Sequence, residues 1–126
     1  MVCIARGWEL DVERGPDWLL VRPRLLSGEI EETPPLAEQI WGLLEQHMTH
    51  RLVLELDQLN FLGSYLIGQL VWLHKRICTH GGLMRICGLS PANQEVLHIC
   101  RLDDRFPQYQ DRTEAIMGNY RPGQPR

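Results

Sequence analysis

Excess basic residues, long apolar runs and closely paired cysteines are all missing from this sequence of 126 residues. The chain has 13 basic and 16 acidic residues, a formal net charge of -3, and a single lysine, Lys75. A nucleic-acid binder usually carries a basic excess or a basic stripe, so we expect no nucleic-acid partner. Gly68 and Gln69 interrupt the most apolar stretch. A membrane span needs roughly 20 apolar residues, so we also expect no direct membrane insertion.

The cysteines and the first residues of the chain exclude further classes of protein. None of the 4 cysteines forms a Cys-x-x-Cys pair, which excludes a thioredoxin-like motif and the compact ligand pairs of zinc sites. His74 and Cys78, four residues apart, leave a metal site only as a minor alternative to cysteines acting as small apolar residues. We therefore expect no cofactor. Arg6 and Glu9 lie where a secretory signal needs an apolar core, so we expect a cytoplasmic protein with reduced thiols.

No catalytic motif is present. The sequence lacks Gly-x-Ser-x-Gly, Gly-x-x-x-x-Gly-Lys, and a Gly-x-Gly-x-x-Gly after a predicted strand. Asp103 and Asp104 form an acidic pair, but they come too late in the chain for the phosphoacceptor site of a receiver domain, so a solvated turn is the better interpretation. We predict that the protein is not an enzyme, and a small enzyme or nucleotide binder is kept only as a minor alternative.

The first part of the chain is typical of a β-hairpin. Residues 8–13 alternate apolar and charged side chains, residues 14–17 form a turn cluster, and residues 18–26 are a second predicted strand. Pro23 places its part of that strand at an edge or bulge.

The next segment is predicted to be a helix that begins at 33–35 and leads to a strand over 51–56, the strongest strand signal in the chain. A helix between two strands favours a crossover to a parallel strand. Residues at helical spacing predict the core face of this helix: Leu36, Ile40, Leu43, Leu44 and Met48.

A second helix is predicted to begin at Ser64, whose hydroxyl would cap it, and to end at Gly81-Gly82. Its predicted core face consists of Leu66, Ile67, Leu70, Val71, His74, Ile77 and Cys78. A strand over 83–87 and a helix opened by Ser90-Pro91 follow. In that helix Val96, Leu97 and Cys100 are predicted to face inward.

The chain is predicted to end with a short strand over 106–109, a helix over 111–117 and a loose tail. Strands that alternate with helices favour an α/β fold with a mixed, mainly parallel sheet and helices packed on it. We expect a single domain over residues 8–117 and a flexible tail over 118–126.

The junction between the strand at 51–56 and the following helix is the best candidate site. A helix N-terminus offers free amides and partial positive charge, which would stabilise a phosphate on Ser64; a purely structural cap is the alternative. Tyr65, Gln69, Trp72 and Arg76 form a stripe away from the predicted core face. Exposed aromatics and arginine suit a protein contact, unless another element covers Trp72.

The order of these pieces resembles the STAS domain of anti-sigma-factor antagonists. Residues 52–56 (Leu-Val-Leu-Glu-Leu) and 61–68 (Phe-Leu-Gly-Ser-Tyr-Leu-Ile-Gly) are similar to the family's Val-x-Leu-Asp-Leu and Phe-Met-Asp-Ser-Ser-Gly-Leu-Gly. Gly-Gly at 81–82 and Gly-Leu-Ser-Pro at 88–91 follow in the family's order, and 27–31 (Ser-Gly-Glu-Ile-Glu) resembles its earlier Gly-Glu-Leu-Asp. Gly63, Tyr65 and Leu66 stand where the family has Asp, Ser and Gly.

The resemblance implies a non-catalytic protein-interaction module that binds a serine-kinase anti-sigma factor, with Ser64 as the phosphoacceptor. The alternative is an accessory or scaffold subunit of a membrane transporter or signalling assembly, without a phosphorylation cycle. We expect a monomer or weak homodimer. The residues expected to contact the partner are Glu29, Glu31, Leu62, Gly63, Ser64, Tyr65, Leu66, Gln69 and Trp72.

Overall fold

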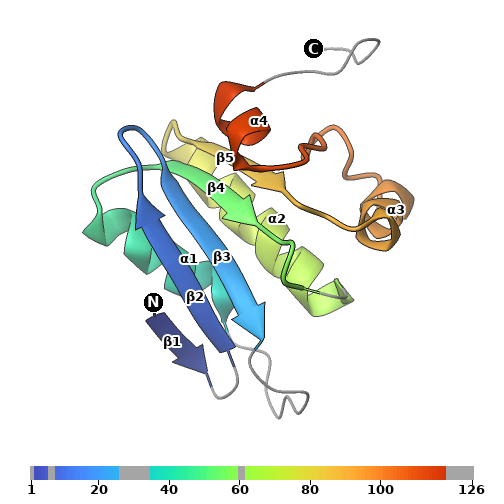
Figure 1. Cartoon of the computed structure of the whole chain (residues 1–126), viewed down its shortest axis with the longest axis horizontal. Helices are drawn as coiled ribbons and strands as arrows, with labels where there is room; N and C mark the ends of the chain where they lie inside the picture. The colour runs from blue at the N-terminus through green and yellow to red at the C-terminus, as the bar shows by residue number, and fades with distance from the viewer. Residues whose placement is uncertain (1, 6–7, 26–34, 60–61, 119–126) are drawn as a thin grey trace.

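The computed structural model describes residues 2–5, 8–25, 35–59 and 62–118, and it confirms the predicted α/β fold (Figure 1). One sheet contains strands β1 (Val2–Ala5), β2 (Trp8–Arg14), β3 (Leu19–Leu25), β4 (Arg51–Glu55) and β5 (Leu83–Cys87). The helices are α1 (Leu36–Gln46), α2 (Ser64–Thr79), α3 (Pro91–Ile99) and α4 (Arg112–Met117). None of the described helices has the length and apolar character needed to cross a membrane.

The sheet is mixed, with its strands side by side in chain order. Strands β1, β2 and β3 pair antiparallel, so the predicted hairpin is present; β3, β4 and β5 pair parallel, as the crossovers require. The β3–β4 pairing stops at Val21, so Pro23 lies beyond it, where its missing amide costs no bond to β4. The edge strand β1 is not predicted by the sequence pattern.

Alternating side chains divide between two apolar clusters on opposite faces of the sheet. The larger cluster joins one face of the sheet to α1 and α2, which lie behind the sheet in Figure 1. On the other face, Trp18, Leu20, Val53 and Cys87 pack with Ala115 of α4. Strand β5 starts beside the start of β4, where the Leu83 amide donates to the His50 carbonyl. The chain approaches so closely here that a side chain on Gly82 would collide with His50.

Several predicted core positions are wrong. Met48 lies beyond the end of α1 and is 90% exposed, because the chain leaves the helix after Gln46 and passes through a left-handed turn at Met48. Cys78 is also exposed, and Cys100 is exposed because it follows the end of α3.

The predicted strand over 106–109 is also wrong. Only an isolated bridge joins Tyr109 to Cys87. Pro107 has no amide to donate to a ladder, which is consistent with the absence of a strand at this position. The last helix is present, with Asp111 as its N-cap. Most of the predicted tail lies outside the described residues, so the domain boundary remains a prediction.

Candidate functional site

The described parts of the connection from β4 to α2, residues 56–59 and 62–63, are anchored in the core. Leu56 donates a hydrogen bond to the Cys87 carbonyl at 2.9 Å, and Leu59 closes a turn onto Leu56 at 3.2 Å. Leu56, Leu59 and Leu62 are buried. These contacts fix the position from which α2 starts, at the end of β4 (Figure 1).

Asn93, in the first turn of α3, holds this connection from the side. Its Oδ1 accepts a hydrogen bond from the Leu62 amide at 3.1 Å, and its Nδ2 donates to the Leu59 carbonyl at 3.3 Å. The side chain is buried, with 1% exposure, and Ser90 caps the same turn by accepting from the Asn93 amide. One buried amide therefore pairs two backbone groups that would otherwise be buried without partners. The sequence analysis missed this residue.

The prediction that Ser64 is the N-cap of α2 is wrong by one residue. Gly63 is the N-cap, with φ -80° and ψ 170°, and its carbonyl accepts from the Ile67 amide at 3.0 Å. Ser64 is the first helical residue, and its side chain is exposed. Among the described residues no side chain caps the first turn, and the turn contains no acidic residue. Its amides, which have no partners within the helix, therefore remain available to an external acceptor.

The predicted stripe on α2 lies beside the start of α1. Tyr65 is 49% exposed and Trp72 is 40% exposed. Gln69 accepts a hydrogen bond from the Ala37 amide at 2.9 Å, which links the two helices. A cavity of about 200 Å³ lies here, lined by Pro35, Ala37, Glu38, Tyr65, Gln69 and Trp72. Trp72 is thus a partly covered surface residue rather than a core residue.

Arg76 orders the aromatic part of this surface. Its guanidinium carbon lies 5.1 Å from the centroid of Trp72 and 4.8 Å from that of buried Trp41. Arg76 therefore bridges an exposed ring and a core ring, in positions that favour cation–π attraction.

The other predicted contact residues have different locations. Leu62 and Leu66 are buried in the main core: Leu62 precedes α2, and Leu66 lies on the face of α2 that packs against the core. Glu29 and Glu31 lie outside the described residues. The structure therefore brings Gly63, Ser64, Tyr65, Gln69 and Trp72 together at one end and one side of α2.

A charged network lies on the opposite face of the sheet and was not predicted. Buried Glu55 accepts hydrogen bonds from Arg22 of β3 at 2.9 Å and from Arg112 of α4 at 2.7 Å. Arg112 also pairs with Glu13. This network ties α4 to the sheet over buried Cys87. Burial, followed by the nearby carboxylate of Glu55, raises the pKa of the Cys87 thiol to about 12.

Metal ligands do not gather in the part of the chain that the structure describes: no group of three or more His, Cys, Asp or Glu side chains there is arranged to hold an ion.

Asp103 and Asp104 are exposed, as a solvated turn predicts. Asp103 pairs with His98 at 2.6 Å, and this hydrogen bond raises the pKa of His98 and lowers that of Asp103. The fold and the site thus define a small α/β domain in which the exposed Ser64 is the first residue of the helix that follows β4.

The family to which such a domain belongs is identified by its sequence. The family model of the STAS domain matches residues 25–115, so the chain belongs to the STAS domain family. It is 26% identical over 110 residues to an anti-sigma F factor antagonist of Paenibacillus polymyxa, in an alignment that covers 86% of this chain and 92% of the relative. The predicted resemblance is confirmed.

Solved structures agree with this placement. An anti-sigma factor antagonist from Mycobacterium paratuberculosis matches with a TM-score of 0.71 and 26% identity, over 88% of this chain and 92% of that chain. The Bacillus cell fate determinant SpoIIAA in its phosphorylated form shares the fold, with a TM-score of 0.62 and 17% identity over 87% and 98% of the two chains. The protein is therefore a STAS domain similar to anti-sigma-factor antagonists.

Proposed function

We propose that this chain is a non-catalytic, cytoplasmic interaction module that binds a serine-kinase anti-sigma factor through the start of α2. One observation carries the proposal: Ser64 is an exposed hydroxyl at the first residue of a helix that has no capping side chain and no acidic residue in its first turn. The similarity to anti-sigma-factor antagonists supports this choice of partner.

The proposed contact surface consists of Gly63, Ser64, Tyr65, Gln69 and Trp72. Tyrosine and tryptophan are enriched among the residues that dominate binding energy at interfaces. Gln69 is already hydrogen bonded to α1, and Trp72 already stacks on Arg76. Side chains ordered before binding lose less conformational freedom when the partner arrives, so this surface is favourable for recognition.

Phosphorylation of Ser64 would control this contact. A phosphate adds about -1.5 to -2 charges at pH 7. The free amides and the partial positive charge of the helix N-terminus would stabilise that charge, so the phosphorylated domain stays folded. The same charge, placed inside a fitted protein interface, disrupts binding through desolvation and repulsion. The proposed switch therefore acts on the partner rather than on the fold.

The test uses candidate anti-sigma kinases from the same genome. Each is incubated with ATP and the purified chain, and phosphosites are mapped by mass spectrometry; we expect phosphate on Ser64 and none on Ser64→Ala. Binding of Ser64→Glu to the same partner should fall at least tenfold. Thr113→Glu is the matched control, because it adds the same charge at an exposed position of α4, and it should bind normally.

Three results would contradict this function: phosphate on another residue only, no phosphate with any candidate kinase, or equal losses of affinity for the two glutamate variants. A pull-down that returns a transporter subunit instead of an anti-sigma factor would favour the accessory-subunit alternative.

A further inference from the structure

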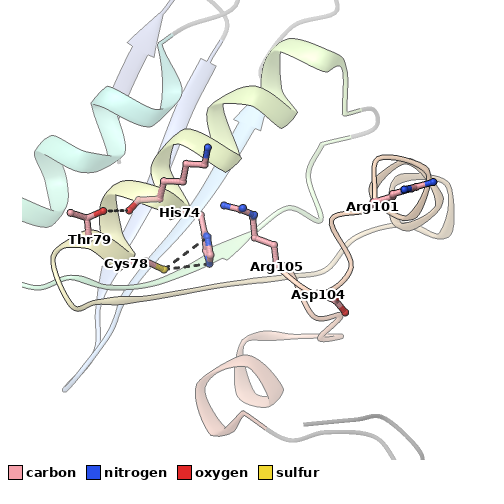
Figure 2. A pocket seen from close by; sticks show the side chains of 7 residues that line it. His74, Cys78, Thr79, Arg101, Asp104 and Arg105 are labelled. Carbon is pink, nitrogen blue, oxygen red and sulfur yellow. Dashed lines mark hydrogen bonds between the residues drawn. The ribbon is translucent and has the colours of Figure 1, made fainter.

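A second cavity lies towards the other end of α2. Figure 2 shows it between the C-terminal half of that helix and the segment that follows α3. It is an open hollow at the surface, with a volume of about 650 Å³. The lining residues are His74, Lys75, Cys78, Thr79, Arg101 and Arg105, together with a single acid, Asp104.

The charges around this cavity are unusual for an acidic chain. Lys75, Arg101 and Arg105 all line it, and within the described residues none of the three takes part in an ion pair. By contrast, Arg22 and Arg112 both pair with the buried Glu55. Uncompensated cations around one hollow raise the local concentration of anions.

Figure 2 also shows how the cavity side chains lie. Arg105 extends towards His74 and α2, whereas Asp104 points away from them. The acid therefore does not neutralise the guanidinium that reaches into the cavity. Arg101 points outward from the end of α3, so it contributes to the rim rather than to the floor.

The imidazole of His74 lines this cavity with a ring that is held in place by its neighbours and carries no charge. Its ring packs edge-on against buried Phe106, with the centroids 5.2 Å apart, and Cys78 Sγ lies 3.6 Å from its Nε2. Burial, followed by the charge of Arg105, lowers the pKa of His74, so the imidazole is neutral at pH 7. A neutral imidazole provides hydrogen bonding without adding to the repulsion between Lys75 and Arg105.

We propose that this cavity binds a small phosphorylated metabolite, with its phosphate groups between Lys75 and Arg105. A guanidinium binds phosphate with two parallel hydrogen bonds, and an ammonium adds a compact point charge. The hollow continues past these two cations along His74, Cys78 and Thr79, so a ligand larger than one phosphate would contact these side chains. His74 is ten residues after Ser64, about 15 Å along the helix, so this site is separate from the proposed partner surface.

The test is a calorimetric titration of the full chain with pyrophosphate at low ionic strength. We expect saturable binding with one ligand per chain, and amide shifts in NMR spectra that are confined to residues 74–79 and 101–105. Arg105→Gln should weaken binding at least tenfold. Arg14→Gln, which removes the same charge from an exposed position at the end of β2, should change it less than twofold.

Thermal melting of both variants checks that each is folded at the temperature of the titration. The proposal is overturned if pyrophosphate binding does not saturate, if the two arginine variants lose affinity equally, or if the shifts map elsewhere. It is also overturned if a hexaglutamate peptide binds the cavity more tightly than pyrophosphate, because the occupant would then be an acidic protein segment.

Discussion

Replacing Asn93 with alanine should show how much the hydrogen bonds to the β4–α2 connection contribute to the free energy of unfolding. The buried Asn93 amide pairs the Leu62 amide and the Leu59 carbonyl. Each buried polar group left unpaired costs about 1–3 kcal/mol. Two such groups predict a loss of about 2–6 kcal/mol from the free energy of unfolding, a large part of the roughly 5–15 kcal/mol that a domain of this size has.

Urea unfolding followed by tryptophan fluorescence measures this loss, since Trp8, Trp18 and Trp41 are buried and report on global unfolding. Gln94→Ala is the control in the same helix. Its Nε2 donates to the Leu89 carbonyl at 3.0 Å, but the residue is exposed, so its loss should cost less than about 1 kcal/mol. An Asn93→Ala loss below 1 kcal/mol, or equal losses for the two variants, would refute the assignment of Asn93 as the residue that holds the connection.

Four further predictions follow from single contacts. Glu55→Gln should lower the free energy of unfolding in urea by about 1–3 kcal/mol. This range allows for solvent screening, because the two paired arginine side chains are about one-third exposed. Hydrogen exchange in α4 should become faster. Gly63→Asp should raise the free energy of unfolding, measured in urea, by about 0.3–1 kcal/mol, because it adds a capping carboxylate at the positive end of α2 in place of glycine. The pKa of His98 should exceed 6.5 in an NMR titration and should fall in Asp103→Asn. The pair stabilises the fold most between about pH 4 and 6.5. The contribution of His98 is lost as pH rises through its raised pKa, and that of Asp103 is lost as pH falls through its lowered pKa. With its pKa raised to about 12, Cys87 should resist iodoacetamide at pH 8 until urea unfolds the chain, and its labelling in the folded protein would contradict the burial of this thiol.

Local patterns predicted the elements that carry their own signals. The β2–β3 hairpin has alternating side chains and a turn cluster, and α3 has a cap and a proline at its start. Met48 shows the limit of this reasoning: helical spacing continues to it, but the helix has already ended so that the chain can reach β4. Strand β1 depends on its pairing with β2, a contact that no local pattern contains.

The long-range contacts of the candidate site could not be predicted from the sequence for a similar reason. Asn93 is 31 residues from Leu62, and its role depends on the position of α3 beside the β4–α2 connection. Glu55 gave a strand signal, but its arginine partners are 33 and 57 residues away. Sequence spacing predicts which side chains share one helix face, whereas the packing of separate elements decides which polar groups meet.

The one-residue difference at the start of α2 changes how the site is understood. A capping serine would have its hydroxyl engaged by the helix that it begins, and a modifying enzyme would have to break that bond. In the structure Gly63 takes the cap position in an extended conformation that any residue adopts, so the backbone does not require glycine there. The hydroxyl of Ser64 is exposed and outside the cap, next to amides that have no capping side chain. Without an aspartate at position 63, no carboxylate neutralises the positive end of the helix beside Ser64, and the proposed phosphate-dependent contact would use this property.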